Sequence, residues 1–130
     1  GRMAVHLGYS EELAMQIYAG ADLFLMPSKS EPCGLSQMIA MRYGAVPIVR
    51  ETGGLKDTVH AYEAWNGQGN GFTFANYNAG DMCHVICEAI DLYHNNKDAY
   101  AALQKRGMTA DFSWTRSAQE YRNIYESICR

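Results

Sequence analysis

The residues with the clearest chemical potential lie in a polar loop that follows a short apolar run. Leu23–Met26 is apolar throughout, and the loop Pro27–Gly34 after it contains one carboxylate, Glu31. A phosphate beside Glu31 would repel it, whereas sugar hydroxyls would donate hydrogen bonds to it. Glu31 is therefore better suited to accept hydrogen bonds from sugar hydroxyls than to lie beside a phosphate.

A helix is predicted directly after Gly34, and this leaves backbone donors at its start. The N–H groups of Gly34, Leu35 and Ser36 would point out of the helix N-terminus, where the helix dipole favours an anion. The Ser36 hydroxyl would add a further donor. A glycine before a helix is also an ordinary turn, with Glu31 as a solvated acid, so this local pattern leaves both interpretations open.

The elements that must position this loop alternate along the chain. Strands are predicted at Arg2–Leu7, Leu23–Met26, Val46–Val49 and Gly71–Phe74, the second of them buried on both faces. Helices are predicted from Ser10 to Gly20, from Leu35 to Tyr43, from an Asp81 cap to Asn95, from an Asp98 cap to Gly107, and from Ser113 onward. This alternation predicts an α/β protein with a partial Rossmann-like parallel sheet and flanking helices. A doubly wound domain has about six strands, so we expect the later part of a larger domain.

In an open parallel sheet, ligands bind at the carboxyl ends of the strands. Three connections are predicted at that edge: Gly8–Ser10, Pro27–Gly34 and Glu51–Leu55. The first contains Tyr9, and the third contains the glycine turn Gly53-Gly54.

Composition narrows the class of protein. The chain has 130 residues, of which 48% are hydrophobic and 19% charged, as in one globular domain. Its formal charge of −3 argues against nucleic-acid binding. No apolar run reaches the roughly 18 residues of a membrane span, and the pattern predicts no signal peptide.

The cysteines predict reduced thiols and no metal. Cys33, Cys83, Cys87 and Cys129 form no Cys-x-x-Cys pair. Cys83, His84 and Cys87 would suit a metal, but the two thiols are four residues apart on a periodic helix, which favours core packing. The other histidines are dispersed.

Several blocks of the sequence together closely resemble bacterial glycogen synthases and plant starch synthases. The matching blocks are Gly20–Gly44, with Glu31-Pro32-Cys33-Gly34-Leu35-Ser36-Gln37 at its centre, then Arg50–Val59, Asn70–Phe74 and Asp111–Trp114. They cover nearly the whole chain in the order of the family.

The resemblance implies a retaining hexosyltransferase of the GT-B fold, with two Rossmann-like domains and the active site between them. Such enzymes transfer glucose from ADP-glucose to the non-reducing end of an α-1,4-glucan, without a cofactor. Residues 1–130 would be one partial domain, the later part of the C-terminal donor-binding domain, with the N-terminal domain absent from this chain. The implied location is the cytoplasm, or the plastid in a plant.

The resemblance also implies roles for individual residues. Glu31 would contact the donor glucose and serve catalysis. The other implied donor-site residues are Tyr9, which would stack on the nucleobase, Gly34, Leu35 and Ser36 at the diphosphate, and Cys33, Thr52, Gly53 and Gly54 beside the donor. On the residues alone, Tyr9 could be a surface ring, Cys33 a small packed thiol and the Thr52–Gly54 segment a plain turn.

The sequence departs from the family pattern in two places. Lys29-Ser30 replaces a common Arg-Phe pair, which removes an aromatic ring from the loop. Ile39 stands where many related transferases carry a second glutamate, and this agrees with glycogen synthases, which generally lack that acid.

The cationic groups that hold the diphosphate in this family would lie upstream of the chain. Such groups stabilise charge on the leaving nucleotide, so we expect the chain alone to be inactive and a weak nucleotide binder. The helix from Ser113 would pack toward the missing domain, which would leave an apolar stripe exposed or available for self-association. The stripe comprises Ala118, Tyr121, Ile124, Tyr125 and Ile128.

Other interpretations remain. A sucrose-type synthase or a nucleotide-sugar epimerase would share the fold, but Ile39 and the Cys33–Gln37 segment argue against them. A non-catalytic α/β nucleotide-binding or receiver-like module is a different class. A receiver needs clustered acids for Mg²⁺, and Asp22 and Glu31 form no such cluster. A piece without any retained binding is the last alternative.

Overall fold

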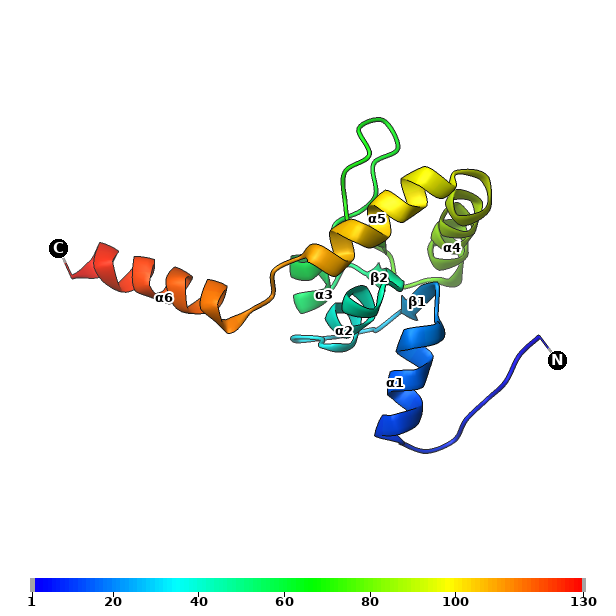
Figure 1. The fold of residues 1–130 in the computed structure, drawn as a ribbon, viewed down its shortest axis with the longest axis horizontal. Helices are drawn as coiled ribbons and strands as arrows, with labels where there is room; N and C mark the ends of the chain where they lie inside the picture. The colour runs from blue at the N-terminus through cyan, green and yellow to red at the C-terminus, as the bar shows by residue number, and fades with distance from the viewer. Residues whose placement is uncertain (1, 130) are drawn as a thin grey trace.

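A computed structural model describes residues 2–129, and a parallel three-stranded sheet lies at its centre. The strands are β1 (Leu23–Met26), β2 (Val46–Arg50) and β3 (Phe72–Phe74), in the order β1-β2-β3, and Figure 1 labels the first two. The helices are α1 (Glu11–Gly20), α2 (Ser36–Tyr43), α3 (Gly54–Thr58), α4 (Ala79–Asn95), α5 (Lys97–Thr109) and α6 (Trp114–Ile128). The predicted α/β class and parallel pairing are confirmed.

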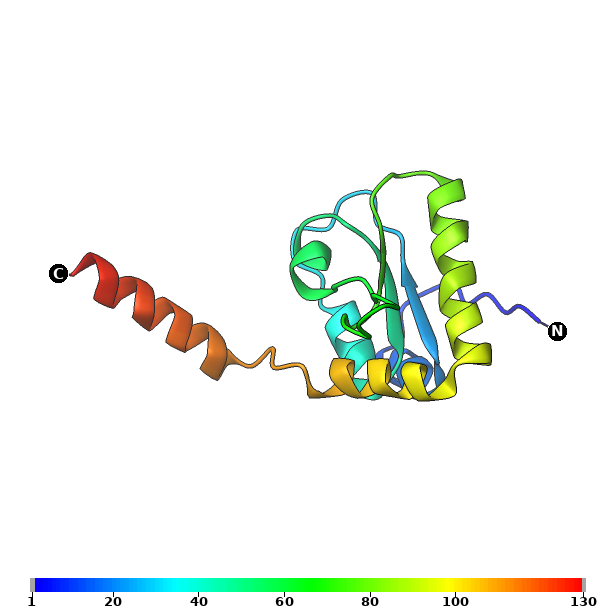
Figure 2. The ribbon, with the colours of Figure 1, turned by 90° about the horizontal axis from the view of Figure 1, so that it is seen from above.

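Strand β2 organises the core because both of its faces are buried. Alternate side chains of a strand point to opposite faces. Val46 and Ile48 pack with β3 and with α4 and α5, through residues such as Leu103. Val49 packs on the other face with Met41 of α2, and Leu55 and Val59 join this second cluster. The sheet therefore lies between α4 on one side and α2 and α3 on the other, and α5 runs across one end of it from α4 to α2 (Figure 2).

The predicted strand over Arg2–Leu7 is wrong. These residues form no strand and run away from the sheet toward α1 (Figures 1 and 2). Their apolar side chains are almost fully exposed, with Leu7 at 90%. Alternating apolar residues favour a strand only where a sheet edge supplies hydrogen-bond partners, and none reaches this segment.

Strand β1 is less buried than its apolar sequence predicts. Leu25 is 41% exposed because β1 forms one edge of the sheet, with only β2 beside it. An apolar run predicts a strand but not how many layers cover it.

Two of the predicted helix caps are confirmed and two are wrong. Ser10 and Ser113 accept hydrogen bonds from the first turns of α1 and α6, as expected. The cap of α4 is Asn78, which accepts from the Asp81 N–H at 2.8 Å, and the cap of α5 is Asn96. Asn and Asp cap equally well, and an acid inside the first turn is also favourable, so the sequence did not separate the two positions.

The packing role predicted for Cys83 and Cys87 is also wrong. Both thiols are exposed, because α4 turns Val85 and Ala89 toward the sheet instead. Nor does any cluster of three or more histidine, cysteine or acidic residues suited to a metal occur within residues 2–129.

Helix α6 extends away from the rest of the chain (Figure 1). Its stripe residues Tyr121, Ile124, Tyr125 and Ile128 are between 56% and 70% exposed. The expected exposure of this stripe is confirmed. Across the described part of the chain, no helix has the length and apolar character needed to cross a bilayer.

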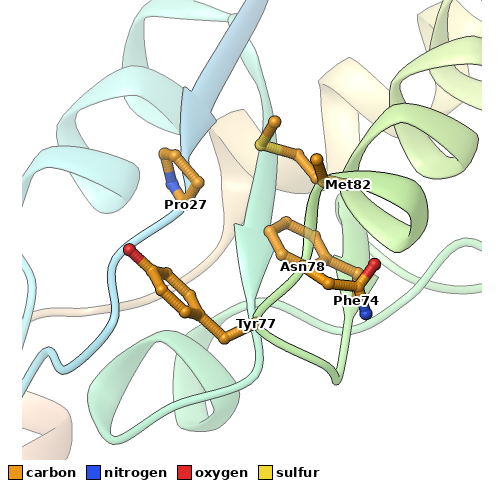
Figure 3. Close-up of a pocket in the computed structure, with 6 residues that line it drawn as sticks. Pro27, Phe74, Tyr77, Asn78 and Met82 are labelled. Atoms are coloured by element: carbon orange, nitrogen blue, oxygen red, sulfur yellow. The ribbon is translucent and has the colours of Figure 1, made fainter.

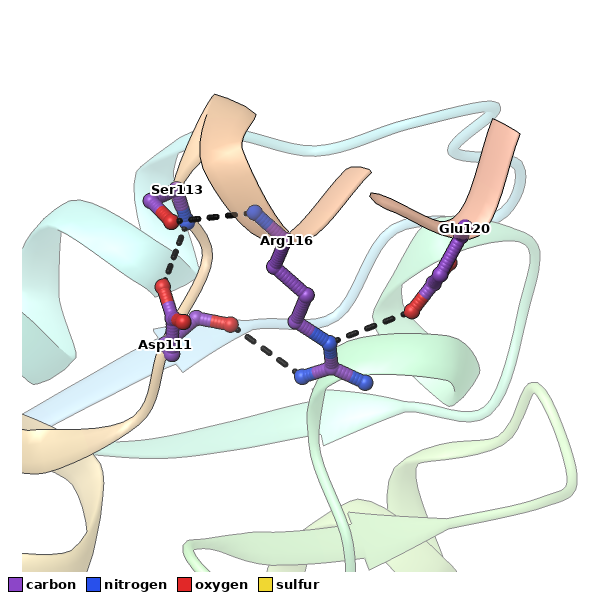
Figure 4. A network of polar contacts seen from close by, with 4 residues as sticks. All are labelled: Asp111, Ser113, Arg116 and Glu120. Atoms are coloured by element: carbon purple, nitrogen blue, oxygen red, sulfur yellow. Dashed lines mark hydrogen bonds and ion pairs between the residues drawn. The ribbon is translucent and has the colours of Figure 1, made fainter. Parts of the chain in front are cut away.

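The start of α6 provides a pH-dependent prediction. Hydrogen bonds from the Ser113 hydroxyl and, to a lesser extent, from the Ser113 backbone N–H lower the pKa of Asp111 from its usual value. Arg116 donates to the Asp111 backbone carbonyl (Figure 4). A pKa lowered by folding stabilises the folded state above the unfolded pKa, and this contribution disappears as the pH falls through the folded pKa. We expect NMR to show a pKa of the Asp111 carboxyl below that of an ordinary aspartate, and the Ser113→Ala variant to raise it.

The matched control is Ser127→Ala, at the other end of α6, which should leave the Asp111 pKa unchanged. An unchanged Asp111 pKa in Ser113→Ala would show that the Ser113 hydroxyl does not stabilise the ionised carboxylate.

Candidate functional site

The loop after β1 lies directly against the turn after β2. The Gly54 N–H donates to the Pro32 carbonyl at 3.3 Å. A Cβ at Gly53 would lie 2.0 Å from the Glu31 carbonyl oxygen, and a Cβ at Gly54 would lie 1.8 Å from that of Cys33. Only glycine permits this approach of two backbones. The structure therefore brings Glu31 and Cys33 together with Gly53 and Gly54.

The N-terminus of α2 is open. Gly34 has φ of +68°, and Leu35 provides the N-cap position without a side-chain cap. The backbone N–H groups of Gly34, Leu35 and Ser36 find no acceptor among the residues that the structure describes. The first turn holds no acid. The predicted anion-binding donors are thus present and unpaired.

Glu31 precedes the first of these donors by three residues in the same loop. Its side chain is half-buried, and its carboxylate pairs with no donor within residues 2–129. Cys33 is exposed, so it is not the packed thiol of the alternative interpretation. Thr52 shapes the turn, since its carbonyl accepts from Leu55 N–H at 3.1 Å.

Tyr9 is not brought to this cluster. It precedes α1 and is 86% exposed, in the segment that leads away from the sheet. Its stacking on a nucleobase stays a prediction.

Sequence reasoning missed two side chains at this edge. Arg50, the last residue of β2, donates to the Lys29 carbonyl at 2.9 Å, and its guanidinium carbon lies 5.6 Å from the Tyr77 ring centroid. Arg50 thus joins the loop after β1 to the segment after β3. A cation at the last position of a buried strand was the available signal. The second is Gln37, whose amide is fully buried against Gly34.

An apolar hollow lies at the same edge, on the α4 side. A cavity of about 340 Å³ is lined by Pro27, Phe74, Tyr77, Asn78, Ala79 and Met82 (Figure 3). None of the predicted site residues lines this hollow. The candidate donor site is therefore the Glu31–Ser36 loop and the glycine turn, rather than this cavity.

A parallel sheet with flanking helices and an open helix N-terminus at its carboxyl edge defines a Rossmann-like α/β protein. The chain belongs to the family described as glycosyl transferases group 1, whose model matches residues 2–108.

Similar proteins narrow the comparison. The chain is 58% identical over 128 residues to a glycogen synthase of Desulfitobacterium hafniense, covering 98% of this chain and 27% of that protein. It is 56% identical over 127 residues to a glycogen synthase of Bacillus cereus, covering 98% of this chain and 26% of that protein. The chain therefore spans about a quarter of the length of these relatives.

A solved structure gives the same picture. The catalytic domain of starch synthase IV from Arabidopsis thaliana, bound to ADP and acarbose, superposes with a TM-score of 0.83 at 41% identity. The match covers 95% of this chain and 26% of that chain. The expectation that this chain forms part of a GT-B fold is thereby confirmed. The glycogen or starch synthase interpretation is favoured over the sucrose-type synthase, epimerase and non-catalytic alternatives.

Proposed function

We propose that this chain is the later part of the donor-binding domain of a glycogen or starch synthase. The whole enzyme would transfer glucose from ADP-glucose to the 4-hydroxyl at the non-reducing end of an α-1,4-glucan, with retention. The observation that carries this proposal is the open α2 N-terminus in the same loop as Glu31, against the Gly53-Gly54 turn. The similarity to a starch synthase solved with ADP and acarbose supports it.

Different residues would bind different parts of the donor, according to the charge of each part. The N–H groups of Gly34, Leu35 and Ser36 would bind the diphosphate, and the α2 dipole would favour the charge that develops as ADP leaves. Glu31 would be kept from the phosphates by repulsion and would accept hydrogen bonds from glucose hydroxyls. Cys33 and the Thr52, Gly53 and Gly54 turn would line the donor pocket, and Tyr9 would stack on the base.

The chain alone should lack transferase activity. The proposed glucan groove, the N-terminal domain and the further cations at the diphosphate would all lie in the part of the enzyme outside this chain. No metal is required, since backbone donors and cations would hold the diphosphate. We expect a cytoplasmic enzyme, or a plastid enzyme if the source is a plant.

Titration of ADP into the chain, followed by backbone amide NMR, tests the proposal. We expect shifts concentrated at Gly34, Leu35, Ser36 and Tyr9, with a Kd no tighter than about millimolar, because a few neutral donors hold the ligand. Tyr9→Ala should weaken the shifts. Glu31→Ala should retain or strengthen them, because the ligand carries phosphates and no glucose.

The control ligand is adenosine, which has the base without the phosphates and should leave Gly34–Ser36 unshifted. If ADP shifted amide signals elsewhere in the chain but none at the N-terminus of α2, the proposal would be contradicted.

A further inference from the structure

Gln37 is a fully buried polar side chain between the two loops of the candidate site. Its Nε2 donates to the Gly34 carbonyl at 2.8 Å and to the Thr58 hydroxyl oxygen at 3.0 Å. The Thr58 hydroxyl in turn donates to the Gly54 carbonyl at 2.6 Å. One chain of hydrogen bonds therefore runs from Gly34, beside the open α2 N-terminus, to Gly54, in the turn after β2.

The orientation of the Gln37 amide is fixed by its partners. Both protons of Nε2 are used, on two acceptors. A reversed amide would place its oxygen against the Gly34 carbonyl oxygen and against the Thr58 hydroxyl, whose proton is used on Gly54. The Gln37 side chain therefore connects the two loops in one amide orientation only.

Gly34 rests directly on this amide. A Cβ at Gly34 would lie 2.7 Å from the Gln37 Oε1 and 2.9 Å from its Nε2. The φ of +68° at Gly34 sets the direction of the N–H groups that follow, and the Gln37 bond to the Gly34 carbonyl holds that conformation. The amide therefore lies beneath the proposed diphosphate donors.

A glutamine at this position has a cost as well as a benefit for stability. Its Oε1 is buried and finds no donor among the described residues, and an unpaired buried acceptor opposes folding. Its Nε2 supplies the donor for the buried Gly34 carbonyl, which an apolar residue of the same length would leave without one. The hydrogen bonds of the amide therefore link the conformation of Gly34 to Thr58 and Gly54.

We infer that Gln37 is a positioning residue that fixes the N–H groups of Gly34, Leu35 and Ser36 for the donor diphosphate and locks that loop to the turn at Gly54. The inference rests on the proposed function for its ligand, while the positioning itself is a property of the unliganded chain.

A matched pair of variants tests the inference. The two ends of α2 are held in the same way, since Gln104 Nε2 donates to the Gly44 carbonyl at 2.7 Å at the other end. Gln37→Met and Gln104→Met each replace the glutamine by an apolar side chain of similar length and so remove its hydrogen bond to the glycine carbonyl. We expect Gln37→Met to weaken ADP binding about tenfold, by the loss of aligned donors, and Gln104→Met to leave it unchanged.

A second measurement needs no ligand. Backbone ¹⁵N relaxation should show a loss of order at Gly34–Ser36 and Gly53-Gly54 in Gln37→Met, and no such loss in Gln104→Met. Thr58→Val should cause the same loss of backbone order as Gln37→Met. Thr58→Ser, a separate variant that keeps the hydroxyl, should have the order of the wild-type chain.

The outcomes separate the two proposals. Wild-type order at these residues in a folded Gln37→Met variant would overturn the positioning role, whatever ADP does. Failure of the wild-type chain to bind ADP at α2, with the order of Gly34–Ser36 still lost in Gln37→Met, would contradict the proposed function and support the positioning role.

Discussion

The Gly54→Ala variant should lose more than about 2 kcal/mol of unfolding free energy, because an added Cβ would enter the backbone of the neighbouring loop. That Cβ would lie 1.8 Å from the Cys33 carbonyl oxygen and 2.8 Å from the Cys33 Cα. Backbone cannot rotate aside as a flexible side chain can, so the Glu31–Cys33 segment must shift. Urea denaturation measures the loss, and amide NMR should show the displaced loop.

Alanine variants of two other glycines test whether contact with the loop causes the loss of stability in Gly54→Ala. Gly67 has φ of +70° in open space, so Gly67→Ala should lose only about 1 kcal/mol, from backbone strain. Gly20 ends α1 with no atom within 4 Å of an added Cβ and no left-handed backbone, so Gly20→Ala should be neutral or stabilise by up to about 1 kcal/mol. Gly54 has no left-handed backbone to strain, so a loss in Gly54→Ala no larger than that in Gly67→Ala would contradict the predicted contact with the Cys33 backbone.

The Leu55→Ala variant should lose about 2–5 kcal/mol of unfolding free energy and also disturb the donor loop. Leu55 is 0% exposed and packs with Met41, Val49 and Val59. Its Cδ2 would lie 3.0 Å from a Cβ at Gly34, so the leucine also supports Gly34 from below. Denaturation and the amide shifts of Gly34–Ser36 measure the two effects.

Leu103→Ala is the matched comparison. Leu103 is also 0% exposed, but it belongs to the cluster on the other face of the sheet. We expect a loss of stability of similar size and unchanged amide shifts at Gly34–Ser36. If Leu103→Ala moved those shifts as much as Leu55→Ala does, the two faces of the core would not act separately on the site.

Most of the fold followed from local patterns. Ser10 and Ser113 were identified as caps because their hydroxyls bond groups only three residues away. Strand β2 was predicted because its apolar run, bounded by Gly44 and Thr52, has the length and composition of a buried strand.

The errors arose where local patterns were equivalent. Asp81 and Asn78 are both good caps, and the carboxylate fits equally well inside the first turn of α4. Cys83 and Val85 both suit an apolar face, and the angle at which α4 meets the sheet decided which of them is buried. The apolar alternation of Arg2–Leu7 predicted a strand, but whether a sheet edge is available is a property of the whole chain.

The candidate site, like the fold, was predictable from local sequence only in part. The sequence by itself determined the chemistry of the site. One short loop contains a carboxylate, a glycine and the start of a helix, and these residues supply the hydrogen-bond acceptor and donors whatever the rest of the fold does. Only the tertiary structure placed Gly53-Gly54 against Glu31–Cys33, inserted the Gln37 amide beneath Gly34 and extended Arg50 to Lys29. Those contacts join residues separated by up to about twenty positions in the chain, and their geometry depends on how β1 and β2 pair and on how α2 packs against them. Local propensity carries no information about such distances, because it is set by neighbours along the backbone, whereas these contacts are set by the packed core.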